Sequence, residues 1–249
     1  MIILKSLQEI EKIRKACLIV ADVLDGIRGM IRPGRTTQAL DEFAERFILA
    51  AGAKPAFKGY RGYPKTLCTS VNNEVIHGIP SKDVVLKQGD IVSVDVGAIV
   101  DGFYGDAAIT IPVGTITPEA ERLMMITEES LLRGIAQAKA GNRLYDISHA
   151  IQRYVESNGC SVVREFVGHG IGRSLHEDPQ IPNFGVPGQG LRLKPGMVLA
   201  IEPMVNVGGG TTVVQEDNWT AVTVDGSLSA HFEHTIAVMP DGPWILTKK

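Results

Sequence analysis

The sequence predicts an α+β fold in which two related halves face each other across a shared site. The first indication is an internal echo: residues 87–95 and 194–202 both read Lys-x-Gly and then an apolar strand that ends in a carboxylate. A second echo places a carboxylate at the start of an apolar strand in both 105–109 and 232–236. The third is the tripeptide His-Gly-Ile, which occurs twice, at residues 77–79 and 169–171. Three echoes in the same order indicate two copies of one α/β unit.

The composition agrees with a single globular domain over residues 1–249. The chain has 25 Lys and Arg against 28 Asp and Glu, a formal net charge of −3 and 44% hydrophobic residues. It therefore lacks the basic footprint of a nucleic-acid-binding protein, and we expect no DNA partner. The apolar content, together with 27 Gly and 13 Pro, excludes disorder and coiled coil.

The cysteines and the N-terminal stretch predict a cytoplasmic protein. Cys17, Cys68 and Cys160 are odd in number and far apart, which is typical of a reducing compartment. The first residues mix charged and apolar side chains, unlike a signal peptide or a membrane anchor. The longest apolar run, residues 91–100, is interrupted by polar residues and is too short to span a bilayer.

Two amphipathic helices are predicted in the first half. Ser6 and Glu9 form the pattern of a capping box, after which apolar residues recur at helical spacing until Gly29 and Pro33 end the helix. A second helix follows Thr37, and its buried side is expected to carry four apolar residues: Leu40, Phe43, Phe47 and Ile48.

The second half also contains two predicted helices, separated from the first pair by strands. Thr117 is an expected N-cap, and Pro118 follows it at the first helical position. Asn142 is the expected cap of the next helix, which Gly159 closes. Apolar runs predict five strands between and after these helices, at residues 91–98, 103–111, 197–201, 219–224 and 232–238.

The dipeptide Asp101-Gly102 predicts a two-residue hairpin turn between the first two strands. A turn at this dipeptide sets Asp95 opposite Ala108, whose neighbour on the same face is Asp106. The two aspartates are then diagonal neighbours, about 7–8 Å apart at the backbone. Two ionised carboxylates on an apolar sheet repel each other and are costly to desolvate, so we expect a cation between them.

The second half adds three more donors to this site. Glu202 ends one predicted strand, Glu233 begins another, and His169 lies between glycines. Four carboxylates and one imidazole suit two divalent ions, and this oxygen-rich set favours manganese, iron or cobalt over a structural zinc. A water that bridges the two ions becomes acidic enough to serve as a hydroxide nucleophile.

The chain resembles type I methionine aminopeptidases of the short bacterial form. The resemblance covers nearly the whole chain and rests on six stretches, namely residues 60–64, 73–80, 101–106, 168–172, 201–204 and 232–235. It implies the pita-bread fold, in which two pseudo-symmetric halves with antiparallel sheet surround a dinuclear metal site. The family's five metal ligands fall on the residues already assembled: Asp95, Asp106, His169, Glu202 and Glu233.

The resemblance also implies a reaction and roles for three residues. It implies removal of the N-terminal methionine from nascent polypeptides when the second residue is small and uncharged, with zinc as a further alternative metal. The bridging hydroxide attacks the scissile carbonyl, and Glu202 acts as general acid and base. His176 matches the histidine that contacts the carbonyl oxygen, and His77 matches the one beside the substrate nitrogen. Taken alone, both histidines also fit a structural role.

The same comparison implies an apolar pocket for the methionine side chain. Its walls are Phe57, Tyr60, Tyr63, Cys68, Leu175 and Trp219, with His77 and His176 nearby. Taken alone, these aromatic residues also fit plain core packing. Leu175 stands where many relatives carry phenylalanine, so selection of methionine is expected to be less strict. A monomer is expected, and the basic residues Lys12, Arg14 and Lys15 are the cluster to test for ribosome contact.

Two other readings remain open from the sequence. One is another pita-bread peptidase that acts on x-Pro bonds, a group that usually carries an additional N-terminal domain. The other is a non-catalytic binding module on the same fold, a group that usually loses metal ligands or catalytic histidines. Metal binding and the cleavage of methionyl peptides separate these readings.

Overall fold

The computed structural model describes residues 2–249. Its helices are α1 (Leu7–Met30), α2 (Thr37–Ala50), α3 (Pro118–Gln137) and α4 (Leu144–Ser157), with a one-turn 3-10 helix at Tyr60–Gly62. Its strands are β1 (Lys54–Pro55), β2 (Leu67–Val71), β3 (Glu74–Ile76), β4 (Ile91–Val100), β5 (Phe103–Pro112), β6 (Ser161–Val162), β7 (Gly168–Gly170), β8 (Glu177–Ile181), β9 (Val198–Ile201), β10 (Met204–Asn206), β11 (Thr212–Val214), β12 (Ala221–Thr223), β13 (Ser229–His231), β14 (His234–Met239) and β15 (Gly242–Ile245).

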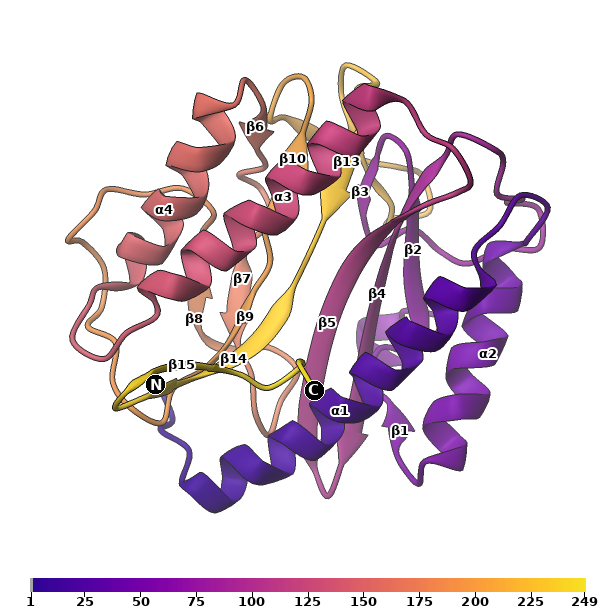
Figure 1. Ribbon diagram of the computed structural model, residues 1–249. Helices are drawn as coiled ribbons and strands as arrows, with labels where there is room; N and C mark the ends of the chain where they lie inside the picture. The colour runs from indigo at the N-terminus through magenta and orange to yellow at the C-terminus, as the bar shows by residue number, and fades with distance from the viewer. Residues whose placement is uncertain (1) are drawn as a thin grey trace.

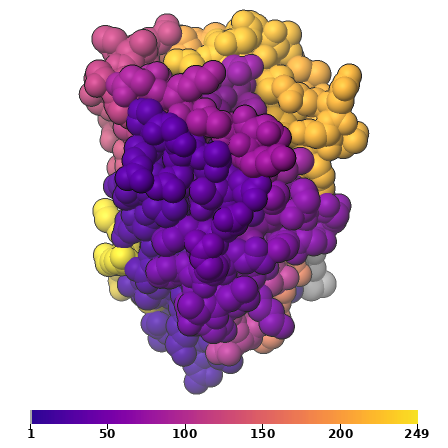
Figure 2. Space-filling model, turned by 90° about the vertical axis from the view of Figure 1, so that its right-hand side faces the viewer, coloured from indigo at the N-terminus to yellow at the C-terminus, as the bar shows by residue number. Residues whose placement is uncertain are grey.

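The elements divide into two halves, each with a pair of helices over a sheet (Figure 1). In the first half β4 pairs with β1, β2 and β5, and α1 packs against β4 and β5. In the second half the sheet order is β15-β14-β9-β7-β8, and α3 packs against α4. Two smaller sheets, β13-β10-β6 and β11-β12-β3, complete the fold. Figure 2 shows the indigo and purple atoms of the first half covering most of one side of the molecule.

The helix ends follow the predicted capping chemistry at α1 and α3. The hydroxyl of Ser6 accepts from the Glu9 backbone N–H at 3.3 Å, and the Glu9 carboxylate accepts from the Ser6 N–H at 3.0 Å. At α3 the Thr117 hydroxyl accepts from the Ala120 N–H at 3.2 Å, with proline at the first position. Each cap satisfies a backbone donor that the helix leaves free.

The predicted cap of α4 is wrong by one residue. Arg143 precedes the helix, and its backbone N–H donates to the carboxylate of Asp146 at 2.7 Å. The side chain of Asn142 instead donates to the carbonyl of Gln137 at 2.9 Å. Asn142 therefore closes the loop after α3, and an aspartate in the first turn of α4 takes over the capping role.

The predicted hairpin of β4 and β5 is confirmed in its register. Val100 pairs with Phe103 across the turn, and both turn residues are left-handed, with φ of 51° at Asp101 and 77° at Gly102. The strands predicted at 219–224 and 232–238 are shorter, at Ala221–Thr223 and His234–Met239. Several strands of two to five residues were not predicted, because so short a run shows little two-residue alternation.

The two halves meet along β5 and the segment that leads into β14. The backbone N–H of Glu233 donates to the carbonyl of Ala108 at 2.8 Å. In the same seam the hydroxyl of Thr110 donates to the carbonyl of His231 at 2.9 Å. These bonds fix the aspartates of one half relative to the carboxylates of the other. Within residues 2–249, no helix combines the length and apolarity needed to cross a bilayer.

Candidate metal centre

Asp95 and Asp106 lie on adjacent strands and share one face of the sheet. Asp95 pairs with Ala108, and Gly97 pairs with Asp106, so the two aspartates are diagonal neighbours as expected. Within the described chain, Oδ1 of each aspartate is buried without a hydrogen-bond partner. A buried carboxylate oxygen without a partner is costly, so this face requires a further electropositive group.

Three potential donors come from the second half. His169 is the middle residue of β7, Glu202 directly follows β9, and Glu233 directly precedes β14. Because Ile201 pairs with His234, the two glutamates leave their strands at the same level. Oε1 of Glu233 is also buried without a partner in the part of the chain that the structure describes.

The ring of His169 is held in one tautomer. Its Nδ1 lies 2.9 Å from the carbonyl oxygen of Gly170, which can only accept, so Nδ1 carries the proton. Nε2 then has a free lone pair, and it lies 3.5 Å from Oε1 of Glu202. A backbone carbonyl that fixes the far nitrogen of a histidine is a common support for a metal ligand.

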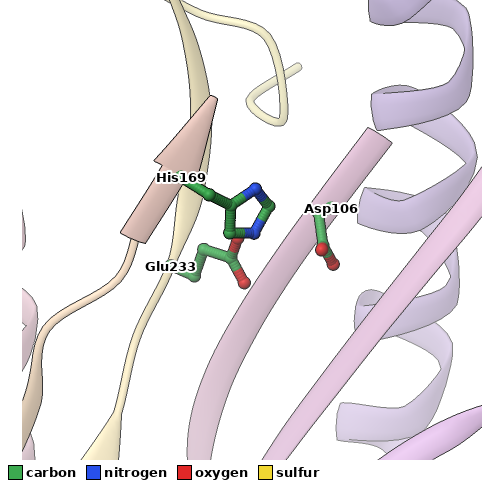
Figure 3. Close-up of side chains that lie close together, drawn as sticks. All are labelled: Asp106, His169 and Glu233. Carbon is green, nitrogen blue, oxygen red and sulfur yellow. The ribbon is translucent and has the colours of Figure 1, made fainter. Parts of the chain in front are cut away.

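The donors of the two halves converge on one point. Figure 3 shows Asp106 on β5, across from His169 and Glu233, which come from the opposite half. One ligand atom from each of these three residues lies within 4.8 Å of the other two. Asp95 and Glu202 line the same cavity as this trio. The structure thus brings together all five residues predicted as ligands.

The ionisation of these groups reflects their burial. Desolvation raises the pKa of Asp95 to about 7 and that of Glu202 to about 8. The pKa values of Asp106 and Glu233 are also raised well above their usual range, first by burial and then by neighbouring carboxylates. Burial lowers the pKa of His169 to about 3, which leaves the imidazole neutral and ready to bind a cation.

This donor set fits a divalent metal ion. Buried carboxylates repel one another, and a bound cation would offset this repulsion and give their unpaired oxygens a partner. A neutral imidazole beside four carboxylates is the oxygen-rich, mixed set that manganese, iron, cobalt and zinc accept. The charges, the free oxygens and the neutral histidine therefore all point to the same kind of ligand.

A cavity of about 170 Å³ opens onto this cluster. Its apolar walls include Phe57, Tyr63, Cys68 and Leu175, all of which are buried. The hydroxyl of Tyr63 donates to two backbone carbonyls, and its ring meets Trp219 edge-on at 5.0 Å. Every residue predicted for the pocket lines this cavity: Phe57, Tyr60, Tyr63, Cys68, His77, Leu175, His176 and Trp219.

Two more histidines lie at the edge of the metal cluster. Nδ1 of His176 is 2.8 Å from the hydroxyl of Tyr60, and its ring centroid is 4.3 Å from that of His169. His77 has a left-handed backbone, with φ of 62°, and its ring lies 6.2 Å from that of Trp219. Burial lowers the pKa of His77 to about 4, so this imidazole is neutral near pH 7.

Sequence reasoning missed two residues of this region. Arg61 lines the cavity from an exposed position. It lies beside Tyr60 in residues 60–64, one of the stretches that carry the family resemblance, and this was a signal that could have found it. His231 is buried, with Nε2 3.6 Å from Oε2 of Glu202. No pattern marked His231, because its nearness to Glu202 arises only when β10 and β13 pair.

Comparison with known proteins places this geometry in a family. The profile of metallopeptidase family M24 matches residues 11–240. The chain belongs to metallopeptidase family M24. Methionine aminopeptidase from Clostridium perfringens is 57% identical over 247 residues, which is 99% of both chains. Methionine aminopeptidase 1 from Bacillus subtilis is 55% identical over 248 residues, which is 100% of both chains.

Solved structures of M24 proteins share the fold. The crystal structure of methionine aminopeptidase from Thermotoga maritima superposes with a TM-score of 0.99 at 53% identity, and the match covers 100% of both chains. The prolidase from Pyrococcus horikoshii matches with a TM-score of 0.78 at 25% identity, over 99% of this chain but 64% of that one. The predicted pita-bread fold is therefore confirmed, and so is the prediction of a metallopeptidase that uses divalent metal.

Proposed function

We propose that this M24 protein is a methionine aminopeptidase, which releases the N-terminal methionine of polypeptides whose second residue is small and uncharged. The observation that carries the proposal is the small, largely apolar cavity that also exposes four carboxylates and the imidazole of His169. Its support from relatives is the identity of 55–57% to methionine aminopeptidases over essentially the whole chain. The x-Pro peptidase and the binding module are not favoured, because relatives that match over essentially the full length of both chains are methionine aminopeptidases.

Asp95, Asp106, His169, Glu202 and Glu233 would hold two divalent ions, with cobalt, manganese, iron or zinc as candidates. Bound there, the ions would acidify a water molecule and polarise the scissile carbonyl. The protein's part is to present donors that are already desolvated, so that little reorganisation is needed when metal binds. Four carboxylates match the charge of two dications, which supports this stoichiometry over a single ion.

Glu202 is the proposed general acid and base. Its Oε1 lies 3.5 Å from Nε2 of His169, and its Oε2 lies 3.6 Å from Nε2 of His231. Burial raises its pKa to about 8 in the metal-free protein, and bound cations would favour the ionised form. An ionised carboxylate at this position can take a proton from water and return it to the leaving amine.

His176 is the proposed donor to the scissile carbonyl oxygen. The hydroxyl of Tyr60 lies 2.8 Å from Nδ1 of His176. If the phenol donates this bond, the neutral imidazole carries its proton on Nε2. That N–H then stabilises the negative charge that develops on the oxygen. His77 is proposed to contact the substrate backbone beside the scissile bond.

The cavity is the proposed methionine pocket. A linear thioether side chain fits an apolar space of about 170 Å³, and dispersion with aromatic walls favours sulfur. The rim carries His77, His176 and Trp219, so a bulky second residue meets these rings. We further infer that residues 1–249 act as one domain, because the seam between the halves builds the site. A cytoplasmic location and a monomeric state are also proposed, the former from the free cysteines.

The proposal also includes a contact between the ribosome and the basic residues of α1. Within the cluster of Lys12, Arg14 and Lys15, Arg14 donates to the carbonyls of Leu246 and Lys248 and stacks on Trp244 at 5.0 Å. Lys12 lies over the ring of Phe103 at 5.7 Å. Loss of ribosome pelleting in Lys12→Ala and Lys15→Ala variants, with peptide turnover unchanged, would support the contact, and unchanged pelleting would dismiss it.

The deciding experiment is the hydrolysis of Met-Ala-Ser by metal-stripped protein before and after addition of Mn²⁺, Co²⁺ or Fe²⁺. We expect methionine release only with metal, and its loss in Glu202→Gln. Glu129→Gln, on the exposed surface of α3, is the matched control. Release from Met-Ala, Met-Val, Met-Leu and Met-Lys peptides at equal rates would contradict the proposed second-residue preference. Cleavage of x-Pro peptides alone would favour the prolidase reading.

A further inference from the structure

A buried ion pair supports the edge of the active site from outside it. The ammonium group of Lys5 pairs with Oε2 of Glu177, and the two side chains are only 4% and 10% exposed. Lys5 also donates to the carbonyl of Ile3 at 3.0 Å, and its backbone N–H donates to Gly196 at 2.7 Å. Two charges this deeply buried depend on each other, since neither has enough water to solvate it alone.

The other oxygen of the same carboxylate closes a loop. Oε1 of Glu177 accepts from the backbone N–H of Arg173 at 2.7 Å and from that of Ser174 at 3.2 Å. Gly172 packs against the pair so closely that a Cβ there would lie 2.4 Å from Cε of Lys5. One side chain thus joins the N-terminal segment, the loop at residues 172–177 and the start of β8.

This loop carries two residues of the proposed site. Leu175 and His176 lie between the anchored amides and Glu177, and both line the cavity. Beyond the loop itself, the ring of His176 contacts the Tyr60 hydroxyl at 2.8 Å from Nδ1 and lies 4.3 Å from the ring of His169. Any displacement of Glu177 therefore moves the backbone that aims the His176 ring.

We propose that Lys5 and Glu177 are positioning residues, which fix the loop at 172–177 so that His176 meets the scissile carbonyl. The proposal rests on the proposed function, in which His176 touches the substrate. Neither Lys5 nor Glu177 lines the cavity, so both act through the loop. The segment ahead of α1, which crosses from the second half toward the first (Figure 1), is thereby part of the active-site support.

The first test is Lys5→Met in the metal-loaded enzyme. A small misplacement of a group that acts in the transition state is expected to lower kcat for Met-Ala-Ser by roughly tenfold or more. KM should change little, because the residues that line the pocket, other than Leu175 and His176, lie on other elements. Lys5→Arg should restore kcat, and Mn²⁺ affinity measured by calorimetry should be unchanged. Lys249→Met, which removes an exposed ion pair to Asp22 and Asp25, is the matched control.

A double-mutant cycle separates positioning from general destabilisation. In a His176→Ala background, Lys5→Met should have almost no further effect on kcat, because the residue it positions is gone. An equal fall of kcat in both backgrounds would overturn the proposal, and so would an unchanged kcat in Lys5→Met. Should Lys5→Met fail to fold, Glu177→Gln carries the same test, since its amide oxygen still accepts from the loop but no longer pairs with an ammonium.

Amide hydrogen exchange gives a readout that does not depend on activity. The amides of Arg173 and Ser174 should lose protection in Lys5→Met, while those of β4 and β5 keep theirs. Unchanged protection at both positions would overturn the anchoring itself. If the wild-type protein released no methionine from peptides, the proposed function would fail, and the exchange result would still decide whether Lys5 holds the loop.

Discussion

The hydroxyl of Thr235 donates to the backbone carbonyl of Asp106 at 2.8 Å and lies 3.3 Å from the Asp106 backbone nitrogen, which donates to it. The Thr235 side chain on β14 therefore makes two hydrogen bonds to the backbone of Asp106, a proposed metal ligand, where a neighbouring strand would otherwise bond. Both groups are buried, so no water competes for these bonds. The contact couples the joining of the two halves to the placement of the carboxylate.

Thr235→Val should loosen this junction. The variant keeps the shape of the side chain but leaves a buried carbonyl and N–H unpaired, which costs about 1–3 kcal/mol. We expect a lower urea midpoint for the metal-free protein and weaker Mn²⁺ binding by calorimetry. Thr235→Ser, which keeps the hydroxyl, is the control. Equal Mn²⁺ affinity in the valine variant and the wild type would contradict this coupling.

Tyr60→Phe should lower turnover without emptying the pocket. The ring remains as a wall, but the hydroxyl that lies 2.8 Å from Nδ1 of His176 is lost. One hydrogen bond of about 1–1.5 kcal/mol corresponds to a fall in kcat of roughly tenfold. KM for Met-Ala-Ser should stay close to the wild-type value. Tyr154→Phe on α4 is the control, and a fall in kcat of the same size there would refute the assignment.

The metal-free protein should lose stability as pH rises. Burial raises the pKa of Asp95 to about 7 and that of Glu202 to about 8, and it raises those of Asp106 and Glu233 as well. A raised folded-state pKa gives stability that is complete below the unfolded value, about 4, and is lost as pH rises through the folded value. The histidines of the site have lowered pKa values and act in the opposite sense up to about pH 6.5, so the metal-free Tm should fall between about pH 7 and pH 8.5, where they are neutral in both states.

Added Mn²⁺ should remove most of that fall, because the cation stabilises the ionised carboxylates. Asp106→Asn, which removes one of the buried acids, should show a shallower decline of Tm in the metal-free protein. A metal-free Tm that is flat or rising over this range would show that the four carboxylates do not behave as a buried, repelling cluster.

Leu175 should set the strictness of methionine selection. Its side chain is 2% exposed and lines the cavity. Leu175→Phe narrows this space, so kcat/KM for Met-Ala-Ser relative to Leu-Ala-Ser should rise, whereas Leu175→Ala should lower the ratio. Differences of one or a few methylenes are worth about 1–3 kcal/mol in an apolar pocket. The same ratio in all three proteins would exclude Leu175 as a determinant.

The two aspartates show how much local sequence can predict. Asp101-Gly102 fixes the turn, and the two-residue period of strands then fixes which residues share a face. Asp95 and Asp106 were therefore placed correctly without any knowledge of the second half. The echoes between the halves added Glu202, Glu233 and His169, because repeated units fold alike and bring matching positions to one interface.

The residues that support the site from distant parts of the chain could not be predicted from local sequence. Tyr60 and His176 are 116 residues apart in the chain, and Lys5 and Glu177 are 172 apart. His231 lies two residues from Glu233, a proposed ligand, yet its nearness to Glu202 follows from the pairing of β10 with β13. Strands as short as β10 and β13 show no clear two-residue alternation of apolar and polar side chains, so their pairing depends on the packing of the whole domain.

The sequence by itself therefore determined the helix caps of α1 and α3, the long hairpin, the two-half architecture and the five side chains proposed as metal ligands. Each of these depends on turn chemistry, periodicity or repetition within a short stretch of chain. Only the tertiary structure decided which groups lie beside the site, namely Thr235 at Asp106, Tyr60 at His176, and the pair of Lys5 and Glu177 at the loop of residues 172–177. Contacts between distant segments form when both halves are packed, and no local pattern in the sequence encodes where two such segments will meet.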